Sequence, residues 1–116
     1  MSLEERIVSL LGDLVQGRIY PDTTPDNAVF PLITYHQVGG RDYAYMDGSL
    51  PDHEHARLQI NVHGRIRSEA KAAAQQVKKR MAADLQAEIY GSMTIRFDDI
   101  AKLFTTRQDF GCWFPQ

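Results

Sequence analysis

Near its centre the sequence reads Arg57-Leu58-Gln59-Ile60-Asn61-Val62-His63, a strict alternation of polar and apolar residues. Successive side chains of a β-strand point to opposite faces of the sheet, so Leu58, Ile60 and Val62 share one face. The polar residues between them share the other face. Such alternation is typical of an antiparallel sheet that buries one face and leaves the other in water. We therefore expect a half-buried strand here, with the rest of the fold built around it.

Three other segments have the composition of strands. Leu32–Val38 is rich in branched and aromatic residues, and Met93–Phe97 and about Thr105–Phe114 also have strand-like patterns. Every second residue is apolar in Met93–Phe97 and again from Phe110 to Phe114, which predicts one buried face. The residues expected on that face are Met93, Ile95, Phe97, Phe110, Cys112 and Phe114.

Two segments repeat their apolar residues at helical spacing. The first runs from Leu3 to about Gln16, with a capping-box pair at Ser2 and Glu5 before it and Gly17 after it. The second is alanine-rich and runs from a Ser68 cap to about Glu88. Both segments predict amphipathic helices that cover the apolar face of a sheet.

The order of these elements is α-β-β-α-β-β, and the chain of 116 residues fits a single domain, residues 1–116. Hairpins join the strands locally, and the two helices have apolar stripes that must be buried. We therefore predict the α+β class, with a single antiparallel β-sheet of about four strands and two α-helices packed on one face.

The segment from Gly39 to Ala56 is long for a connection in a compact domain. Either it is a bare, mobile loop, or the first strand resumes after a bulge at the paired glycines and forms a long projecting hairpin. Both alternatives place Tyr43, Tyr45 and Met46 on a projecting element. We expect these three residues and Trp113 to form an assembly interface, although Trp113 could instead cover the edge of the core.

Composition argues against several classes of protein. The net charge is −2, whereas nucleic-acid-binding proteins normally carry a basic surplus. The single cysteine, Cys112, rules out an internal disulfide and a thiolate metal cluster, and it fits a reducing compartment. The N-terminus has no signal-peptide pattern, and no apolar run is long enough to cross a membrane. We expect a cytoplasmic protein that has no membrane partner.

The four histidines raise the hypothesis of a metal site. His53 and His55 flank a glutamate, while His36 and His63 lie on expected strands, so convergence of these residues could hold zinc. The His-Glu-His order differs from the helical motif of zinc proteases. We therefore favour solvated histidines and predict no metal and no cofactor.

No other residue set predicts catalysis. Asp98-Asp99 and Asp109 could act as paired carboxylates, but a polar turn between the last two strands explains Asp98-Asp99 better. Cys112 has no evident basic partner that would lower its pKa. The basic run Lys78-Lys79-Arg80 fans around a helix and indicates a solvated surface. The chain is therefore not expected to be an enzyme.

Four ordered segments carry a resemblance to a known family. They are Gly17-Arg18-Ile19-Tyr20-Pro21, Pro31-Leu32-Ile33-Thr34-Tyr35, Arg57-Leu58-Gln59-Ile60-Asn61-Val62-His63 and Arg107-Gln108-Asp109-Phe110-Gly111-Cys112-Trp113-Phe114. With the leucine-rich opening helix and the alanine-rich second helix, they resemble the tail-completion, or head-to-tail joining, proteins of long-tailed bacteriophages and prophages. The ring-forming tail terminators have a similar plan, and the sequence does not separate the two roles.

The resemblance implies a structural protein of virion assembly. Its partners would be copies of itself in a ring, the phage tail tube and the head connector, and the isolated subunit could be monomeric. It would act in the host cytoplasm during assembly and remain in the tail or neck of the virion. The resemblance implies no catalytic residue and no cofactor. Two other functions stay open, a small metal-dependent enzyme that uses the histidines and a nucleic-acid-binding module.

Overall fold

The computed structural model describes residues 2–41, 46 and 53–115. These residues form two α-helices, one 3₁₀ helix and five strands. In chain order the elements are α1 (Leu3–Leu11), η1 (Gly12–Val15), β1 (Ile19–Pro21), β2 (Leu32–Arg41), β3 (His53–Gly64), α2 (Arg67–Asp84), β4 (Glu88–Asp98) and β5 (Leu103–Pro115).

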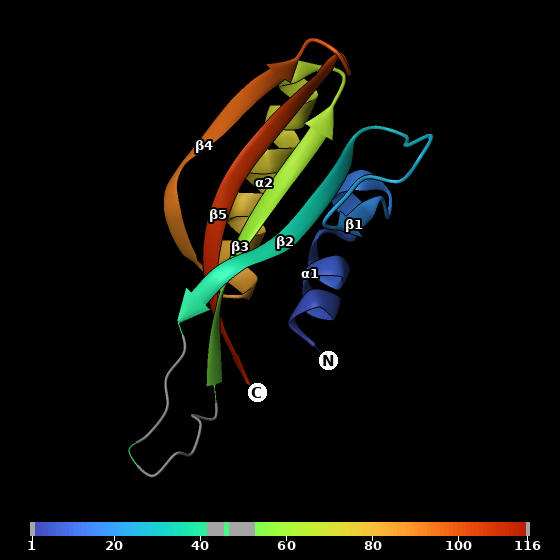
Figure 1. Ribbon diagram of the computed structural model, residues 1–116. Coiled ribbons are helices and arrows are strands. Elements are labelled where there is room, and N and C mark those ends of the chain that lie inside the picture. Colours follow the sequence, from blue (N-terminus) through green and yellow to red (C-terminus); the bar gives the residue numbers. More distant parts are fainter. Residues whose placement is uncertain (1, 42–45, 47–52, 116) are drawn as a thin grey trace.

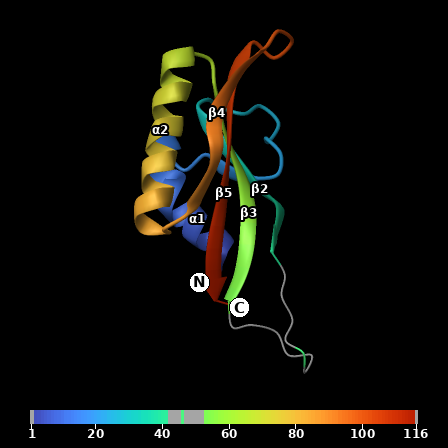
Figure 2. The same ribbon diagram turned by 90° about the vertical axis from the view of Figure 1, so that its left-hand side faces the viewer.

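The strands form one sheet in the order β1-β2-β3-β5-β4, and both helices lie on the same side of it (Figures 1 and 2). The predicted α+β class is confirmed. The expectation of about four strands, all antiparallel, is wrong because β1 adds a fifth strand that pairs parallel with β2, Ile19 beside Ile33. Three residues are too few to show an alternating pattern, and Pro21 made the segment resemble a connection.

Of the four ends of the two α-helices, only the start of α1 lies where it was expected. The capping box at Ser2 and Glu5 is confirmed, since the Glu5 amide donates to Ser2 Oγ at 3.1 Å. After Leu11 the chain tightens into η1, and Gln16, which comes before the expected Gly17, is the left-handed cap. The predicted Ser68 cap is wrong, because α2 begins at Arg67 after an extended Ile66 that makes no side-chain cap. The same helix stops at Asp84, four residues short of the predicted end.

The β2–β3 pair is longer than the alternation predicted and follows the hairpin alternative. Strand pairing continues past a bulge between Gln37 and Gly39, and it resumes at His53 on the other strand. Gly40 has a φ of +152°, and a Cβ there would lie 2.1 Å from the carbonyl oxygen of His55. The extension therefore requires glycine at this position. Residues 42–45 and 47–52 lie outside the described part, so the expectation of a mobile loop stays a prediction.

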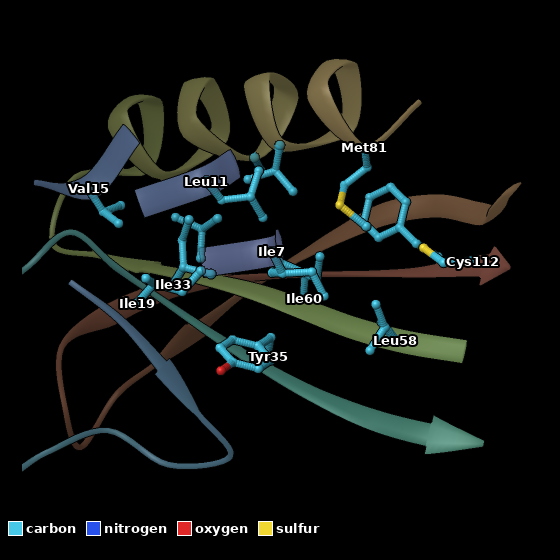
Figure 3. Close-up of a cluster of buried hydrophobic side chains, with 14 of the residues drawn as sticks. Ile7, Leu11, Val15, Ile19, Ile33, Tyr35, Leu58, Ile60, Met81 and Cys112 are labelled. Atoms are coloured by element: carbon cyan, nitrogen blue, oxygen red, sulfur yellow. The ribbon is translucent and has the colours of Figure 1, made fainter. Parts of the chain in front are cut away.

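The core lies between the sheet and the two helices (Figure 3). Leu58, Ile60 and Val62 of β3 all point into it, as the alternation predicted. Helix α1 adds its own apolar stripe, and α2 packs through small side chains that allow close approach to the strands. Fully buried residues from the other elements are Ile7, Leu11, Val15, Ile33, Met81, Phe110 and Cys112.

Arg80 of α2 fixes α1 and η1 onto the second helix. Its guanidinium donates to the carbonyl oxygen of Leu10 at 2.9 Å and pairs with the carboxylate of Asp13. The hydrogen bond from Arg80 lowers the pKa of the Asp13 carboxyl. One residue of the basic run is thus a link between helices, while Lys78 and Lys79 are exposed on the helix surface as expected.

Candidate assembly surface

The face of the sheet opposite the helices carries polar side chains that bind to one another. His63 of β3 lies between two threonines, with Nε2 at 2.9 Å from Thr34 Oγ1 of β2 and Nδ1 at 3.1 Å from Thr105 Oγ1 of β5. Burial lowers the pKa of the His63 imidazole. This ring is therefore neutral at physiological pH and joins three strands through hydrogen bonds.

An ion pair continues this polar face. Arg57 of β3 donates to Asp109 Oδ2 of β5 through Nε at 3.1 Å, and its Nη2 lies 2.9 Å from the same oxygen. Arg107 Nε stands 3.8 Å from the other carboxylate oxygen. The Arg57 guanidinium also lies over the ring of Tyr90, 4.8 Å from its centroid. Arg57 is thereby held in one position although half of its side chain is exposed.

Aromatic rings gather beside this ion pair. His55 and Trp113 face each other on paired strands, edge to face, with ring centroids 4.8 Å apart. His55 is buried, whereas 45% of Trp113 is exposed. Tyr90 Oη donates to Glu88 Oε2 at 2.9 Å and lies 3.3 Å from His55 Nε2. We call His55, Arg57, Tyr90 and Trp113 the aromatic cluster.

Gly111 makes room for the cluster. A Cβ at this position would lie 2.3 Å from Tyr90 Oη and 2.8 Å from two carbons of its ring. The tyrosine ring therefore lies directly on the backbone of β5, which only a glycine permits. The cluster is held in place by the sheet beneath it.

The chemistry of the cluster suits binding of a protein surface. Trp, Tyr and Arg are the residues most enriched at the energetic centres of protein interfaces. Fixed rings and a fixed guanidinium lose little conformational entropy when a partner covers them. The cysteine, in contrast, points into the core on the opposite face, where burial raises the pKa of Cys112 to about 11 and keeps the thiol protonated.

The structure places two of the four expected interface residues. Trp113 lies on the helix-free face as part of the aromatic cluster, and Met46 is fully exposed. Tyr43 and Tyr45 lie outside the described residues. Trp113 does not cover the edge of the core, because it stands on the opposite face from Phe110 and Cys112.

The histidines do not come together as metal ligands in the part of the chain that the structure describes. His63 binds two threonines and His55 contacts Trp113, while His36 of β2 lies beside Gln59 of β3. His53 belongs to β3, but its side chain is outside the described part.

The expected polar turn at Asp98 is present. Its carboxylate accepts the amides of Ile100 and Ala101, and these hydrogen bonds lower the pKa of the Asp98 carboxyl. Asp109 is engaged by Arg57 in the middle of the sheet, so these two aspartates have separate structural roles.

Sequence reasoning did not single out Arg57, Tyr90 and His55, which the structure brings together with Trp113. The alternation did place Arg57 on the polar face, but it could not reveal which β5 residue lies beside it. Tyr90 fell outside the expected strand because a register shift between Tyr90 and Thr94 interrupts the pattern of β4. Gly111 in an otherwise regular strand was the one available signal, since such a glycine often marks close approach of another group.

No helix among the described residues is long and apolar enough to span a membrane. The fold is similar to that of a chain in a solved structure described as the virion of a native gene transfer agent (GTA) particle. The TM-score is 0.64 at 19% identity, over 96% of this chain and 88% of that chain. At this identity the likeness shows the fold. No curated protein matches the chain. The model of the family described as tail completion protein gp17 matches residues 7–110, and the chain therefore belongs to this family of phage tail completion proteins.

Proposed function

We propose that this chain completes the tail of a long-tailed phage and joins it to the head connector as a ring of identical subunits. Membership of the tail completion family makes it a structural protein of a phage tail. The observation that supports the ring and the joining role is the aromatic cluster, which presents Trp113, Tyr90 and Arg57 on the sheet face that none of the described helices covers.

A structural subunit must recognise its neighbours through a surface that is shaped before they meet. The aromatic cluster meets this requirement because each of its groups is held by a partner within the same subunit. Interfaces commonly place such fixed aromatic residues at their centre, with polar residues around them. Around this cluster lie the ion pair of Arg57 with Asp109 and the carboxylate of Glu88.

Met46, Tyr43 and Tyr45 complete the proposed contact surface. They lie between β2 and β3 in the sequence, and Met46 is fully exposed. A methionine in this position adapts to different partner shapes because its side chain is flexible and polarisable. In our proposal this segment contacts a neighbouring protein of the tail or connector, and the aromatic cluster contacts the rest of the ring.

The proposal predicts that Trp113→Ala folds but fails to join heads and tails. Truncation of an aromatic residue at the centre of an interface costs about 2 kcal/mol or more, which weakens each contact about 30-fold. The measurement is complementation of a phage that lacks this gene, scored as infectious particles and by electron microscopy. We expect unjoined heads and tails, with a circular dichroism spectrum of the purified variant like that of the parent.

Phe97→Ala is a matched control, because 47% of Phe97 is exposed and it lies on β4 near the turn to β5, far along the sheet from Trp113. This variant should restore infectious particles. The paired substitutions Tyr43→Ser and Tyr45→Ser should fold normally and fail in complementation, as Trp113→Ala does. Full complementation by Trp113→Ala and by the tyrosine variant would contradict the proposal.

A further inference from the structure

Besides the outer side of the three-residue β1, the sheet has two longer stretches of open edge. Strand β4 is the last strand in the sheet order, so one side of its backbone has no strand partner within the described residues. At the other edge, β1 covers only Ile33–Tyr35 of β2. Beyond this point β2 continues from His36 through Gly40 with no strand on its outer side in the described part, and Gln37–Gly40 are exposed.

These two open stretches lie at the same level of the sheet. Gln37 pairs with Leu58, Leu58 with Phe110, and Phe110 with Ile89. Gln37 and Ile89 are therefore the two ends of one row across four strands, and both belong to the helix-covered face. The row on one side of it ends at Gly39 and Glu88, and the row on the other side ends at His36 and Tyr90.

The strand directions at the two edges also match. Strands β2, β3, β5 and β4 are antiparallel in turn, so β4 runs opposite to β2. If the β2 edge of a second copy lies beside β4, the new pair of strands is antiparallel. The strand directions then keep alternating from one subunit into the next. Neither Glu88–Tyr90 nor His36–Gly40 contains a proline, so both stretches can take part in a ladder.

Side chains at the two edges favour contact with each other. Ile89 is 39% exposed at the β4 edge, and Val38 is 42% exposed at the β2 edge. Two half-exposed apolar side chains on these stretches can lose contact with water when the edges meet. Tyr90 of the aromatic cluster ends one of the matching rows, so a copy seated on β4 also reaches the cluster.

We propose that subunits of this protein join edge to edge, with Glu88–Tyr90 of one copy paired antiparallel to His36–Gly40 of the next. This inference rests on the proposed ring and names the contact that builds it. The contact joins two different edges of the subunit, so it is head-to-tail and can close into a ring. Pairing of β4 with the β4 of another copy would instead stop at a dimer. The partner of the aromatic cluster is then a second copy of this chain.

The test introduces cysteines at the two ends of the shared row. Gln37→Cys and Ile89→Cys are made singly and together, and a short bis-maleimide is added to assembled particles, because its length tolerates a slip of one or two residues in register. Cys112 is buried and stays out of the reaction. The double variant should give a ladder of covalent oligomers, since every copy carries both groups.

The single variants separate the two kinds of contact. Neither Gln37→Cys nor Ile89→Cys alone should cross-link, while an equimolar mixture of the two should give dimers only. Dimers from Ile89→Cys alone would overturn the proposal, because they require β4 beside β4. Absence of a ladder from double-variant particles that are correctly joined and infectious would also overturn it, while leaving the joining function intact. If phage without this gene still join heads to tails, the proposed function itself fails.

Discussion

The two faces of the sheet are built from alternate residues of the same strands, yet they are stabilised in different ways. On the covered face, Leu58, Ile60 and Phe110 are almost fully buried under the helices and gain free energy by leaving water. On the free face, His63, Arg57 and their neighbours are held by hydrogen bonds and ring contacts. The covered face therefore supplies most of the hydrophobic stabilisation, and the free face presents ordered polar and aromatic side chains.

The largest expected effect comes from Ile60→Asp on the covered face. Ile60 is buried in the centre of the sheet, so the substitution places an unpaired carboxylate in the core. We expect a loss of roughly 3–5 kcal/mol, a large part of the ~5–15 kcal/mol of a typical domain. Urea denaturation followed by circular dichroism measures the change.

Asn61→Asp is the matched control, one residue along and on the free face. It should remain folded and melt close to the parent. If Ile60→Asp is as stable as Asn61→Asp, the assignment of the two faces is wrong.

A smaller effect is expected from Gly111→Ala on the free face. The new methyl group would overlap the ring of Tyr90 and push it away from His55 and Glu88. Crowding of this kind costs about 1–2 kcal/mol. A double-mutant cycle with Tyr90→Ala measures the coupling, because removal of the ring should abolish the cost of the methyl group. Additive effects of the two substitutions would show that Tyr90 does not lie on Gly111.

The smallest effect concerns pH and His63. Burial lowers the pKa of the folded imidazole, so the unfolded chain binds the proton more readily. The contribution of His63 is therefore fully present above its ordinary pKa of about 6.5 and declines as the pH falls toward the lowered value. Denaturation of the parent and of His63→Gln at pH 7.5, 6.5 and 5.5 tests this. The parent should lose more stability than the variant on acidification, and parallel profiles would rule out the effect.

The sequence predicted the covered face well because burial leaves a periodic pattern. The alternation identified Leu58, Ile60 and Val62, which the structure buries. The helical spacing of the second helix likewise predicted an apolar stripe, of which the structure buries Ala70, Ala74, Val77 and Met81. Both elements are long enough for the period to stand out. The apolar side of β5, with Phe110 and Cys112, was found in the same way.

The free face was harder to predict because its structure depends on register. His55 meets Trp113, and Arg57 meets Asp109, only because β3 and β5 pair with one particular alignment over some fifty residues of intervening chain. Polar residues leave no periodic signal for such a pairing. The short parallel strand β1 was missed for a related reason, since its partner β2 lies beyond a proline-rich connection.

The partial cover that β1 gives to β2 limits how a further strand could be added. Antiparallel strands can slip by two residues and still place the same side chains on the same face, so a long open edge would accept several alignments. With Ile33–Tyr35 already occupied by β1, the open part of β2 that follows is short within the described residues, from His36 to Arg41. A strand of three residues thus reduces many possible alignments of an added strand to a few.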